Sequence, residues 1–151
     1  MSILSLASGQ SACRGYDYFE NKKVVRFGQT GENSYTGVVS GSSSARYEVV
    51  IDIAHPRKSS CTCPHAAGRR IICKHMVAVY FAAFPEAAER YSAELQAAME
   101  EEEQQQEEYD ALLQKYVAKM KKTELQEALL QLLYQGPEWQ YDQFIRQYID
   151  W

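Results

Sequence analysis

The side chains best suited to chemistry are gathered in residues 59–81. This segment holds three of the four cysteines and two of the three histidines of the 151-residue chain. Four of them follow the spacing C-x-C-x9-C-x-H, namely Cys61, Cys63, Cys73 and His75. Thiolate sulfur and imidazole nitrogen are ligands that Zn²⁺ takes in proteins. The segment therefore predicts a zinc site made of three cysteines and one histidine.

The spacing also indicates where the four residues must lie. Cys61 and Cys63 are two apart, so on an extended strand both sulfurs point to the same face. Within a regular helix Cys73 and His75 would diverge by about 200°. They converge if Cys73 lies just before a helix and His75 lies in its first turn, where the helix dipole also favours a thiolate. Four protein ligands fill a tetrahedral shell, which is typical of a structural zinc site and not of a catalytic one.

Other chemistries fit the segment less well. A Cys-x-Cys pair differs from the Cys-x-x-Cys pair of thioredoxin-like redox proteins, and no βαβ pattern surrounds it. A cysteine–histidine nucleophile pair would leave two cysteines unexplained. His65 is expected to be a turn residue near the site, with metal ligation as the alternative. His55 is expected in an exposed loop, and Cys13, far upstream, is expected to be a small buried hydrophobic residue.

The elements ahead of the site are expected to be short strands. From Tyr16 to about Cys63 the runs KKVVRF, SYTGVV and RYEVVIDIA are rich in β-branched and aromatic residues, with Gly, Ser and Asn between them. The third run alternates between an apolar face (Tyr47, Val49, Ile51, Ile53) and a polar face (Arg46, Glu48, Asp52). Such close spacing favours an antiparallel meander, because a parallel crossover needs about a dozen or more connecting residues.

Helices are expected after Cys73. Residues 74–84 have the pattern of a short, largely buried helix that stops before Pro85, and Pro85 can open a second helix. The acidic run 100–108 is either an exposed part of a long helix or a flexible linker.

Further helical stretches are expected toward the C-terminus. Apolar residues recur at helical spacing over 109–120, and Thr123 with Gln126 forms a capping-box pattern that starts the next helix. Gly136-Pro137 ends that helix and opens a last one. Apolar stripes of this length usually pack into the core of their own chain; docking of a partner is the alternative.

Composition is that of a soluble globular protein. The apolar fraction of 46% allows a core, and no apolar run approaches the roughly 20 residues of a membrane span. The N-terminus has no basic residue ahead of its apolar stretch, so no secretory signal is expected. We therefore expect a cytoplasmic α+β protein: a small antiparallel β-meander with a zinc loop and helix over residues 13–83, followed by a helical region over 84–151.

Charge is unevenly distributed along the chain. Residues 1–90 carry 11 Lys/Arg and 7 Asp/Glu, whereas residues 91–151 carry 5 and 13. Five cations lie near the predicted zinc ligands in sequence: Arg57, Lys58, Arg69, Arg70 and Lys74. They either contact phosphates or only offset the charge of the thiolates. The net charge of −4 argues against non-specific binding to nucleic acid.

These residues resemble a known family. The pattern C-x-C-x9-C-x-H with a following apolar helix is similar to the SWIM zinc finger. The upstream runs RGYDYFENKKVVRF and YTGVVSGSSSARYEVVIDI resemble prokaryotic SWIM-domain proteins, and KKTELQEALLQLLYQGPEW resembles a helical segment of some bacterial relatives. The resemblance covers most of residues 13–83 and, more weakly, 119–148. It implies a zinc-binding module that binds DNA or proteins without an activity of its own, with the family's ligands at Cys61, Cys63, Cys73 and His75.

Three classes of function follow. We expect first a protein-interaction module, whose acidic, striped helices dock a protein partner or a second copy of the chain as a homo-oligomer. DNA or RNA binding through the five cations is the alternative. An enzyme with a small-molecule substrate is not expected, because the ion has no open position and no carboxylate pair, Ser/His/Asp set or phosphate loop is found. Removal of zinc is expected to unfold roughly residues 45–83.

Overall fold

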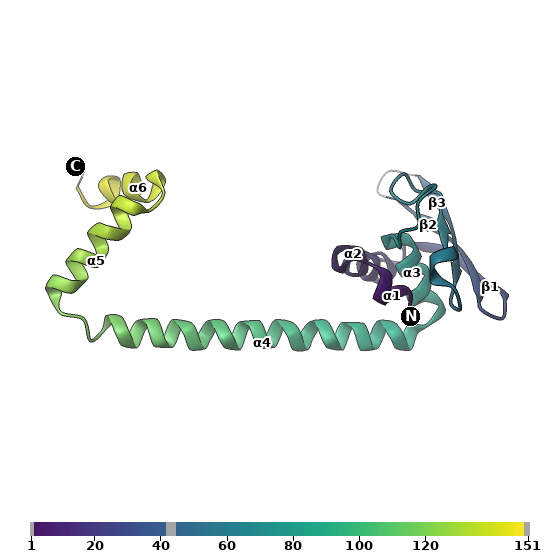
Figure 1. Ribbon diagram of the computed structural model, residues 1–151, viewed down its shortest axis with the longest axis horizontal. Helices are drawn as coiled ribbons and strands as arrows, with labels where there is room; N and C mark the ends of the chain where they lie inside the picture. The colour runs from purple at the N-terminus through teal and green to yellow at the C-terminus, as the bar shows by residue number, and fades with distance from the viewer. Residues whose placement is uncertain (1, 42–44, 150–151) are drawn as a thin grey trace. The chain divides into compact units, whose positions relative to one another are not determined.

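The chain forms two compact units, each described by itself. The computed structural model describes residues 2–41 and 45–149. Unit 1 is Met1–Gln96 and unit 2 is Ala97–Trp151, and most of their elements are labelled in Figure 1. Unit 1 contains an antiparallel sheet and unit 2 is helical, so the predicted α+β class is confirmed.

Unit 1 is built on the predicted meander. Its strands are β1 (Val24–Gly31), β2 (Ser34–Ser40), β3 (Arg46–Asp52) and β4 (Ser60–Cys61), hydrogen-bonded in that order and antiparallel throughout. The alternation expected for the third run is confirmed, since Val49 and Ile51 are buried while Arg46 and Glu48 are exposed. The extended strand expected at Cys61 and Cys63 is the two-residue strand β4, which ends at Cys61; it forms because Ser60 and Cys61 pair with Val50 and Val49.

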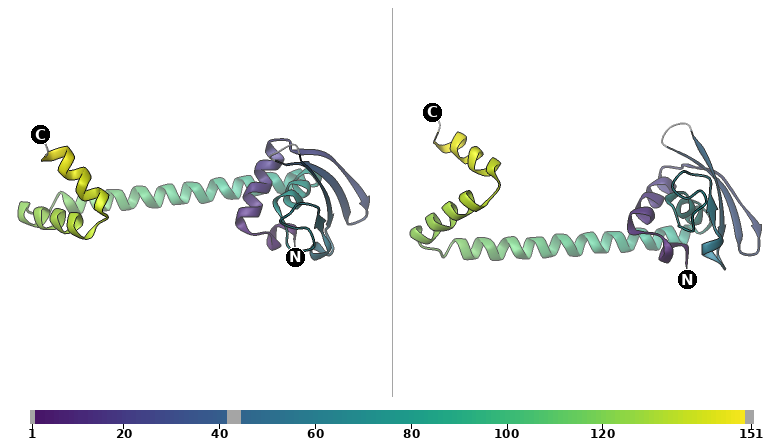
Figure 2. Two further views of the ribbon diagram at one scale, coloured as in Figure 1. Left: turned by 90° about the horizontal axis from the view of Figure 1, so that it is seen from above. Right: turned by 45° about the horizontal axis from the view of Figure 1, so that its top comes forward.

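Helices cover one face of this sheet (Figure 2). They are α1 (Ile3–Leu6), α2 (Gly9–Glu20), α3 (Lys74–Ala83) and the first turns of α4 (Pro85–Val117). α3 lies between α2 and the strands, and contacts both. It supplies the centre of the core, where Met76, Val77, Val79 and Phe81 have no exposed surface. Helix α3 stops before Pro85 as predicted, but Tyr16 lies in a helix and not in the strand region that the sequence predicts.

Two glycines let α3 approach its neighbours closely. A Cβ atom on Gly15 of α2 would lie 2.5 Å from Cβ of Val77, and one on Gly37 of β2 would lie 2.5 Å from Cγ2 of Val79. Distances below about 3 Å are not tolerated between carbon atoms whose contact optimum is about 3.5–4.0 Å. Both positions therefore need glycine, because α3 is packed directly against the backbone of α2 on one side and of β2 on the other.

Unit 2 continues α4 from residue 97 and adds α5 (Lys122–Gln135) and α6 (Glu138–Tyr148). The acidic run 100–108 lies inside α4, so it is helix and not a linker. The predicted capping box at Thr123 and Gln126 is wrong by two residues. α5 begins at Lys122, and the backbone N–H of Lys121 donates a 2.7 Å hydrogen bond to the carboxylate of Glu124. Gly136 ends α5 as predicted.

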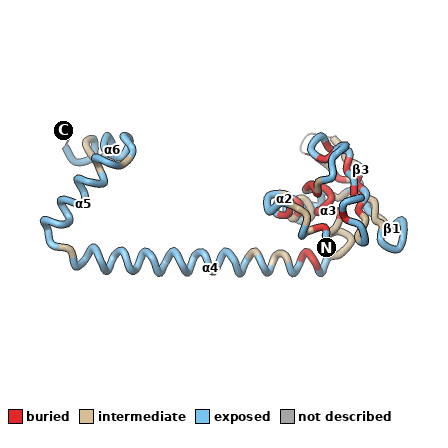
Figure 3. The backbone as a smooth tube through the Cα atoms, viewed as in Figure 1, coloured by how far each residue is buried: buried red, intermediate tan, exposed pale blue. Residues whose placement is uncertain are grey.

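Buried residues are confined to unit 1 (Figure 3). Within the described chain, no residue after Ala88 is buried. The apolar stripes over 109–120 and along α5 are therefore largely exposed, and the expectation that they pack into their own core is wrong for the chain by itself. No helix among those described is long and apolar enough to cross a membrane.

Candidate metal centre

The structure brings the four predicted residues together at one end of α3. One ligand atom from each of Cys61, Cys63, Cys73 and His75 lies within 4.8 Å of the other three, and all four side chains are buried. Cys61 ends β4, Cys63 begins the loop after it, Cys73 precedes α3 and His75 lies in its first turn. Residues from separate elements thus converge on a space of the size that one metal ion needs.

Pairing with β3 positions the first two cysteines. Cys61 of β4 pairs with Val49 of β3. At the next residue, Thr62, the chain makes two more hydrogen bonds to β3. Thr62 N–H donates to the carbonyl of Glu48, and Glu48 N–H donates to the Thr62 hydroxyl, each at 3.0 Å. The N–H of Cys63 then donates to Sγ of Cys61 at 3.4 Å. This last hydrogen bond favours a thiolate at Cys61 and fixes the angle between the two cysteines.

The chain is turned back to α3 by the loop 63–72. The N–H groups of Ala66 and Ala67 both donate to the carbonyl of Cys63, at 3.0 and 2.9 Å. Gly68 has a φ of +70°, the left-handed conformation for which glycine is suited. Ile72 ends the loop in a bridge to Ala7 of the N-terminal segment. The loop is therefore anchored at both ends, and its return places Cys73 opposite β4.

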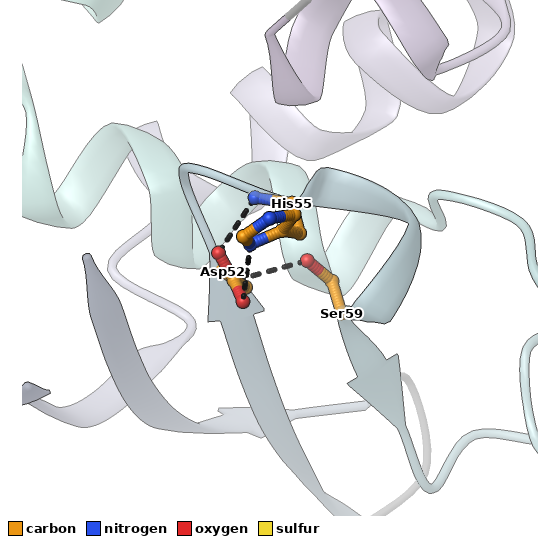
Figure 4. Close-up of polar contacts among 3 residues, drawn as sticks. All are labelled: Asp52, His55 and Ser59. Atoms are coloured by element: carbon orange, nitrogen blue, oxygen red, sulfur yellow. Dashed lines mark hydrogen bonds and ion pairs between the residues drawn. The ribbon is translucent and has the colours of Figure 1, made fainter.

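Polar contacts also fix the connection that leads into β4 (Figure 4). Asp52 accepts a 2.7 Å hydrogen bond from the N–H of His55, and its own N–H donates to the Ser59 hydroxyl at 3.0 Å. Its second carboxylate oxygen lies 3.6 Å from Nδ1 of His55. His55 is exposed, as predicted for a loop residue. These contacts order the turn between β3 and Ser60, one residue before the first cysteine.

Cys73 and His75 sit as their spacing predicted. Cys73 is the N-cap of α3, with extended backbone (φ −94°, ψ 166°), and His75 is the second helical residue. In the metal-free chain the pKa of Cys73 is lowered to about 4, chiefly by a hydrogen bond from Cys61 and also by His75 and helix N–H groups. The same contact, together with burial, raises the pKa of Cys61. Hydrogen bonding between Cys61 and Cys73 thus raises the pKa of one thiol and lowers that of the other, so the two share one proton.

The imidazole of His75 is enclosed by aromatic side chains. The Tyr47 ring stacks on it with centroids 4.7 Å apart, and the Tyr18 ring meets it edge-on at 5.3 Å. Lys74 donates a 2.7 Å hydrogen bond to the Tyr18 hydroxyl. Nδ1 of His75 lies 3.7 Å from Sγ of Cys61, and Nε2 is buried without a hydrogen-bond partner in the described chain. A buried imidazole with so little hydrogen bonding beside three sulfurs is the environment of a metal ligand.

The remaining predicted residues lie elsewhere. His65 is exposed and outside the cluster, as a turn residue should be. Cys13 is exposed on α2, so the prediction that it is buried is wrong. Sequence reasoning assigned no role near the metal site to Gly15, Tyr18 and Tyr47. Their only signal was the Arg-Gly-x-x-Tyr start that resembles prokaryotic SWIM-domain proteins, which contains Gly15 and Tyr18.

The five predicted cations do not line one common hollow. Arg57 and Arg70 line a hollow of about 280 Å³ beside Leu6. Lys74 lines a different hollow of about 330 Å³ against the metal cluster, together with Arg14, which the sequence did not single out. Lys58 and Arg69 are exposed. Within the described residues the one ion pair joins Asp52 and His55, so none of the five cations is paired with a carboxylate.

Fold and cluster together define a small zinc-binding module. The family model of the SWIM zinc finger matches residues 47–84, which include all four clustered residues. The chain therefore contains a SWIM zinc finger that runs from β3 to the end of α3. No curated protein and no solved structure matches the chain.

Proposed function

We propose that this protein is a protein-interaction module: zinc stabilises unit 1, and the helices of unit 2 dock a partner protein. The single observation that carries the proposal is the exposure of large apolar side chains in unit 2. They are Met99, Tyr109, Leu112, Leu113, Tyr116, Val117, Leu125, Leu129, Leu130, Leu132, Tyr134, Trp139, Tyr141, Tyr148 and Ile149. Such density of exposed apolar surface is typical of interaction sites and rare on monomers.

The proposed role of the metal is structural. Three sulfurs and one imidazole suit tetrahedral Zn²⁺, and four protein ligands leave no position for water or substrate. Cys61 and Cys63, in and after β4, and Cys73 and His75, at the start of α3, would hold the ion, which would supply a cross-link between these elements. The chain itself brings the four side chains together. Tyr18 and Tyr47 enclose His75, and pairing of β4 with β3 positions Cys61. On this basis we propose that the module has no catalytic activity and no small-molecule substrate.

The proposed docking surface includes a hollow between α5 and α6. It measures about 600 Å³ and is lined by apolar Leu132, Ala128 and Pro137 with four glutamine or glycine residues. Aromatic rings lie near it, since Tyr134 and Tyr141 pack with centroids 6.3 Å apart. A hollow lined by apolar and amide side chains suits a hydrophobic side chain of a partner with polar groups around it.

Affinity capture with a matched pair of variants tests this function. The full zinc-loaded chain is the bait. Each captured protein is then purified, and its affinity for the chain and for each variant is measured. Leu132→Gln removes an exposed apolar side chain of α5, and Val25→Gln removes one of similar exposure from β1 in unit 1. We expect Leu132→Gln to abolish capture and Val25→Gln to preserve it. A partner that binds both variants equally contradicts docking on unit 2.

Nucleic-acid binding by unit 1 is the second candidate. The observation in its favour is the unpaired state of the described cations around the zinc loop, with Arg57 and Arg70 lining one hollow. Fluorescence anisotropy with labelled single- and double-stranded DNA over a salt series tests it. Replacing both arginines by glutamine should lower the salt slope by about 1 for each phosphate that an arginine neutralises, whereas Arg90→Gln on α4 should not. Absence of binding at low salt rules this candidate out.

A further inference from the structure

A hollow of about 330 Å³ lies beside the metal cluster in unit 1. It is lined by residues of α2, the loop 63–72, the start of α3 and β3. Cys61 does not line it, and its volume is far larger than one metal ion needs, so it extends beyond the position of the ion. Pockets for small ligands begin at about this size, roughly 300 Å³. The hollow can therefore take a small molecule or the end of a larger one.

Two cations line this hollow, and no carboxylate does. Ser11, Arg14 and Tyr18 lie at positions i, i+3 and i+7 on one face of α2, and Lys74 is the first residue of α3. No Asp or Glu is among the lining residues, and the one ion pair of the described chain lies elsewhere. Three thiolates around a divalent ion would leave one negative charge at the cluster. Arg14 and Lys74 exceed that charge, so the hollow favours an anion.

The Lys74 amine is already positioned by the protein. It donates a 2.7 Å hydrogen bond to the Tyr18 hydroxyl and lies 4.2 Å from the centre of the same ring. An ammonium group has three N–H donors, so two stay available to a ligand. The Ser11 hydroxyl accepts a 3.1 Å hydrogen bond from Ser8 and keeps its own proton for donation. Together with the guanidinium of Arg14, three side chains offer donors to the hollow, and little order has to be imposed on Lys74 when a ligand binds.

These donors suit a phosphate monoester better than a diester. A monoester carries a charge of about −1.5 to −2 near neutral pH and three strong acceptor oxygens. A phosphate within a nucleic-acid strand carries a single charge, and one more of its oxygens is used in the chain. Arg14 and Lys74 match the larger charge, and with Ser11 they supply a donor side chain for each terminal oxygen.

Ring side chains line the same hollow. Tyr18, Tyr47 and His65 contribute to it, and His65 is exposed. Nucleobases stack on aromatic side chains while cations hold the phosphate, whereas a phosphoserine has no ring to stack. We propose that this hollow binds a nucleotide, whose terminal phosphate monoester lies against Arg14, Lys74 and Ser11. The nucleotide is a ligand and not a substrate, and its site in unit 1 is independent of partner docking on unit 2.

Isothermal titration calorimetry of the full zinc-loaded chain provides the first test. The ligands are adenosine 5′-monophosphate, adenosine and inorganic phosphate, each added in a phosphate-free buffer. We expect the nucleotide to bind at least about tenfold more tightly than adenosine or phosphate alone, because only the nucleotide uses both the cations and the rings. A nucleotide that does not bind, or that binds no better than adenosine, overturns the proposal.

Matched arginine variants locate the site. Arg14 is exposed, so Arg14→Gln leaves the core intact, and it should weaken nucleotide binding about tenfold through loss of a charge-assisted hydrogen bond. Arg69→Gln is the control, because Arg69 is an exposed cation of the loop 63–72 that does not line the hollow. Replacing Arg57 and Arg70, which line the other hollow, should also leave binding unchanged. Equal losses in Arg14→Gln and Arg69→Gln would show general attraction by positive charge and overturn this site.

Competition against a fluorescent nucleotide identifies the source of the phosphate. The competitors are adenosine 5′-monophosphate, a short single strand with a 5′-phosphate, the same strand with a 5′-hydroxyl, and a phosphoserine peptide. We expect the first two to compete, and the tighter of them assigns the natural ligand to a free nucleotide or to a strand end. If the 5′-hydroxyl strand competes as well as its phosphorylated form, the hollow binds backbone diesters and the proposal is wrong. A phosphoserine peptide that competes as well as the nucleotide also overturns it.

Discussion

The surroundings of His75 include side chains that the spacing of the four clustered residues does not reveal. Its ring is held between Tyr47 and Tyr18, and Tyr18 is in turn held by the Lys74 amine. The C-x-C-x9-C-x-H spacing predicted the four clustered residues because two short-range rules, strand alternation and helix capping, determine where they point. The aromatic enclosure could not be predicted in this way, since Tyr18 and Tyr47 come from α2 and β3, and their distance from His75 depends on tertiary packing.

Removal of one sulfur is predicted to abolish the metal site. In Cys73→Ser the hydroxyl keeps the N-cap position of α3 but offers no thiolate, so zinc affinity should fall by at least about 100-fold and unit 1 should lose stability. Cys13→Ser is the control, because Cys13 is exposed on α2 and lies outside the cluster. Competition with a colorimetric chelator measures the affinity of each variant. Equal zinc affinity in the two variants would contradict the assignment of Cys73.

Zinc binding is predicted to release a proton from the Cys61–Cys73 pair. Hydrogen bonding within the pair raises the pKa of Cys61 and lowers that of Cys73, so the metal-free pair retains a proton at neutral pH. A bound metal needs the thiolate at both positions, and acidification therefore weakens binding and removes the stability that zinc provides. Calorimetry in buffers of different ionisation enthalpy should give different apparent heats. Identical heats would show that no proton leaves.

Individual elements of unit 1 follow from local sequence to different degrees. The three long strands and α3 were predicted because each is a run of β-branched, aromatic or apolar residues that is bounded by Gly, Ser, Asn or Pro. The strand expected at Cys61 and Cys63 has other bounds, since β4 is only two residues long and its extent depends on pairing with β3. α2 was missed because its sequence, with Gly9, Gly15 and several aromatic residues, lacks a strong helical signal. Packing of Gly15 against Val77 explains its stability as a helix.

Close approach of α2 and α3 is predicted to be sensitive to one methyl group. Gly15→Ala places a Cβ 2.5 Å from Cβ of Val77 and 2.9 Å from the carbonyl oxygen of Lys74, so the helices must separate. The expected cost is about 1–3 kcal/mol of unfolding free energy. Gly9→Ala is a matched control on the same helix, with no atom within 4 Å of its new methyl. Thermal unfolding of both variants with zinc bound measures the difference.

For the whole molecule, burial separates the described chain into two parts, of which only unit 1 contains a core and the cluster of Cys61, Cys63, Cys73 and His75. Every buried residue of the described chain lies in unit 1, and the four clustered residues come from β4, the loop after it and the start of the helix at the centre of that core. The sequence predicted helical stripes in the C-terminal region correctly, but periodicity alone does not reveal whether a stripe faces its own core or a partner. Only the folded chain shows that these stripes are exposed.

Chelation is predicted to unfold unit 1 beyond the zinc loop itself. The sequence predicts loss of structure over roughly residues 45–83; because α3 carries the core, we now expect α2 and the strands to lose protection with it. Hydrogen exchange before and after addition of a chelator measures this by segment. α5 and α6 contain none of the clustered residues, so their exchange should be unchanged. Zinc removal without loss of protection in α2 contradicts this prediction.

Helix α4 has a buried beginning and a long exposed continuation. Ala87 and Ala88 are packed in the core of unit 1, whereas the acidic segment that follows in the same helix has no buried residue. Starting an isolated helix is costly, with a nucleation constant of about 10⁻³, while extending one is nearly free. A folded unit 1 provides the first turns, and the glutamate-rich segment needs only to extend them. Helicity of a segment that touches no metal should thus depend on the metal state of the finger.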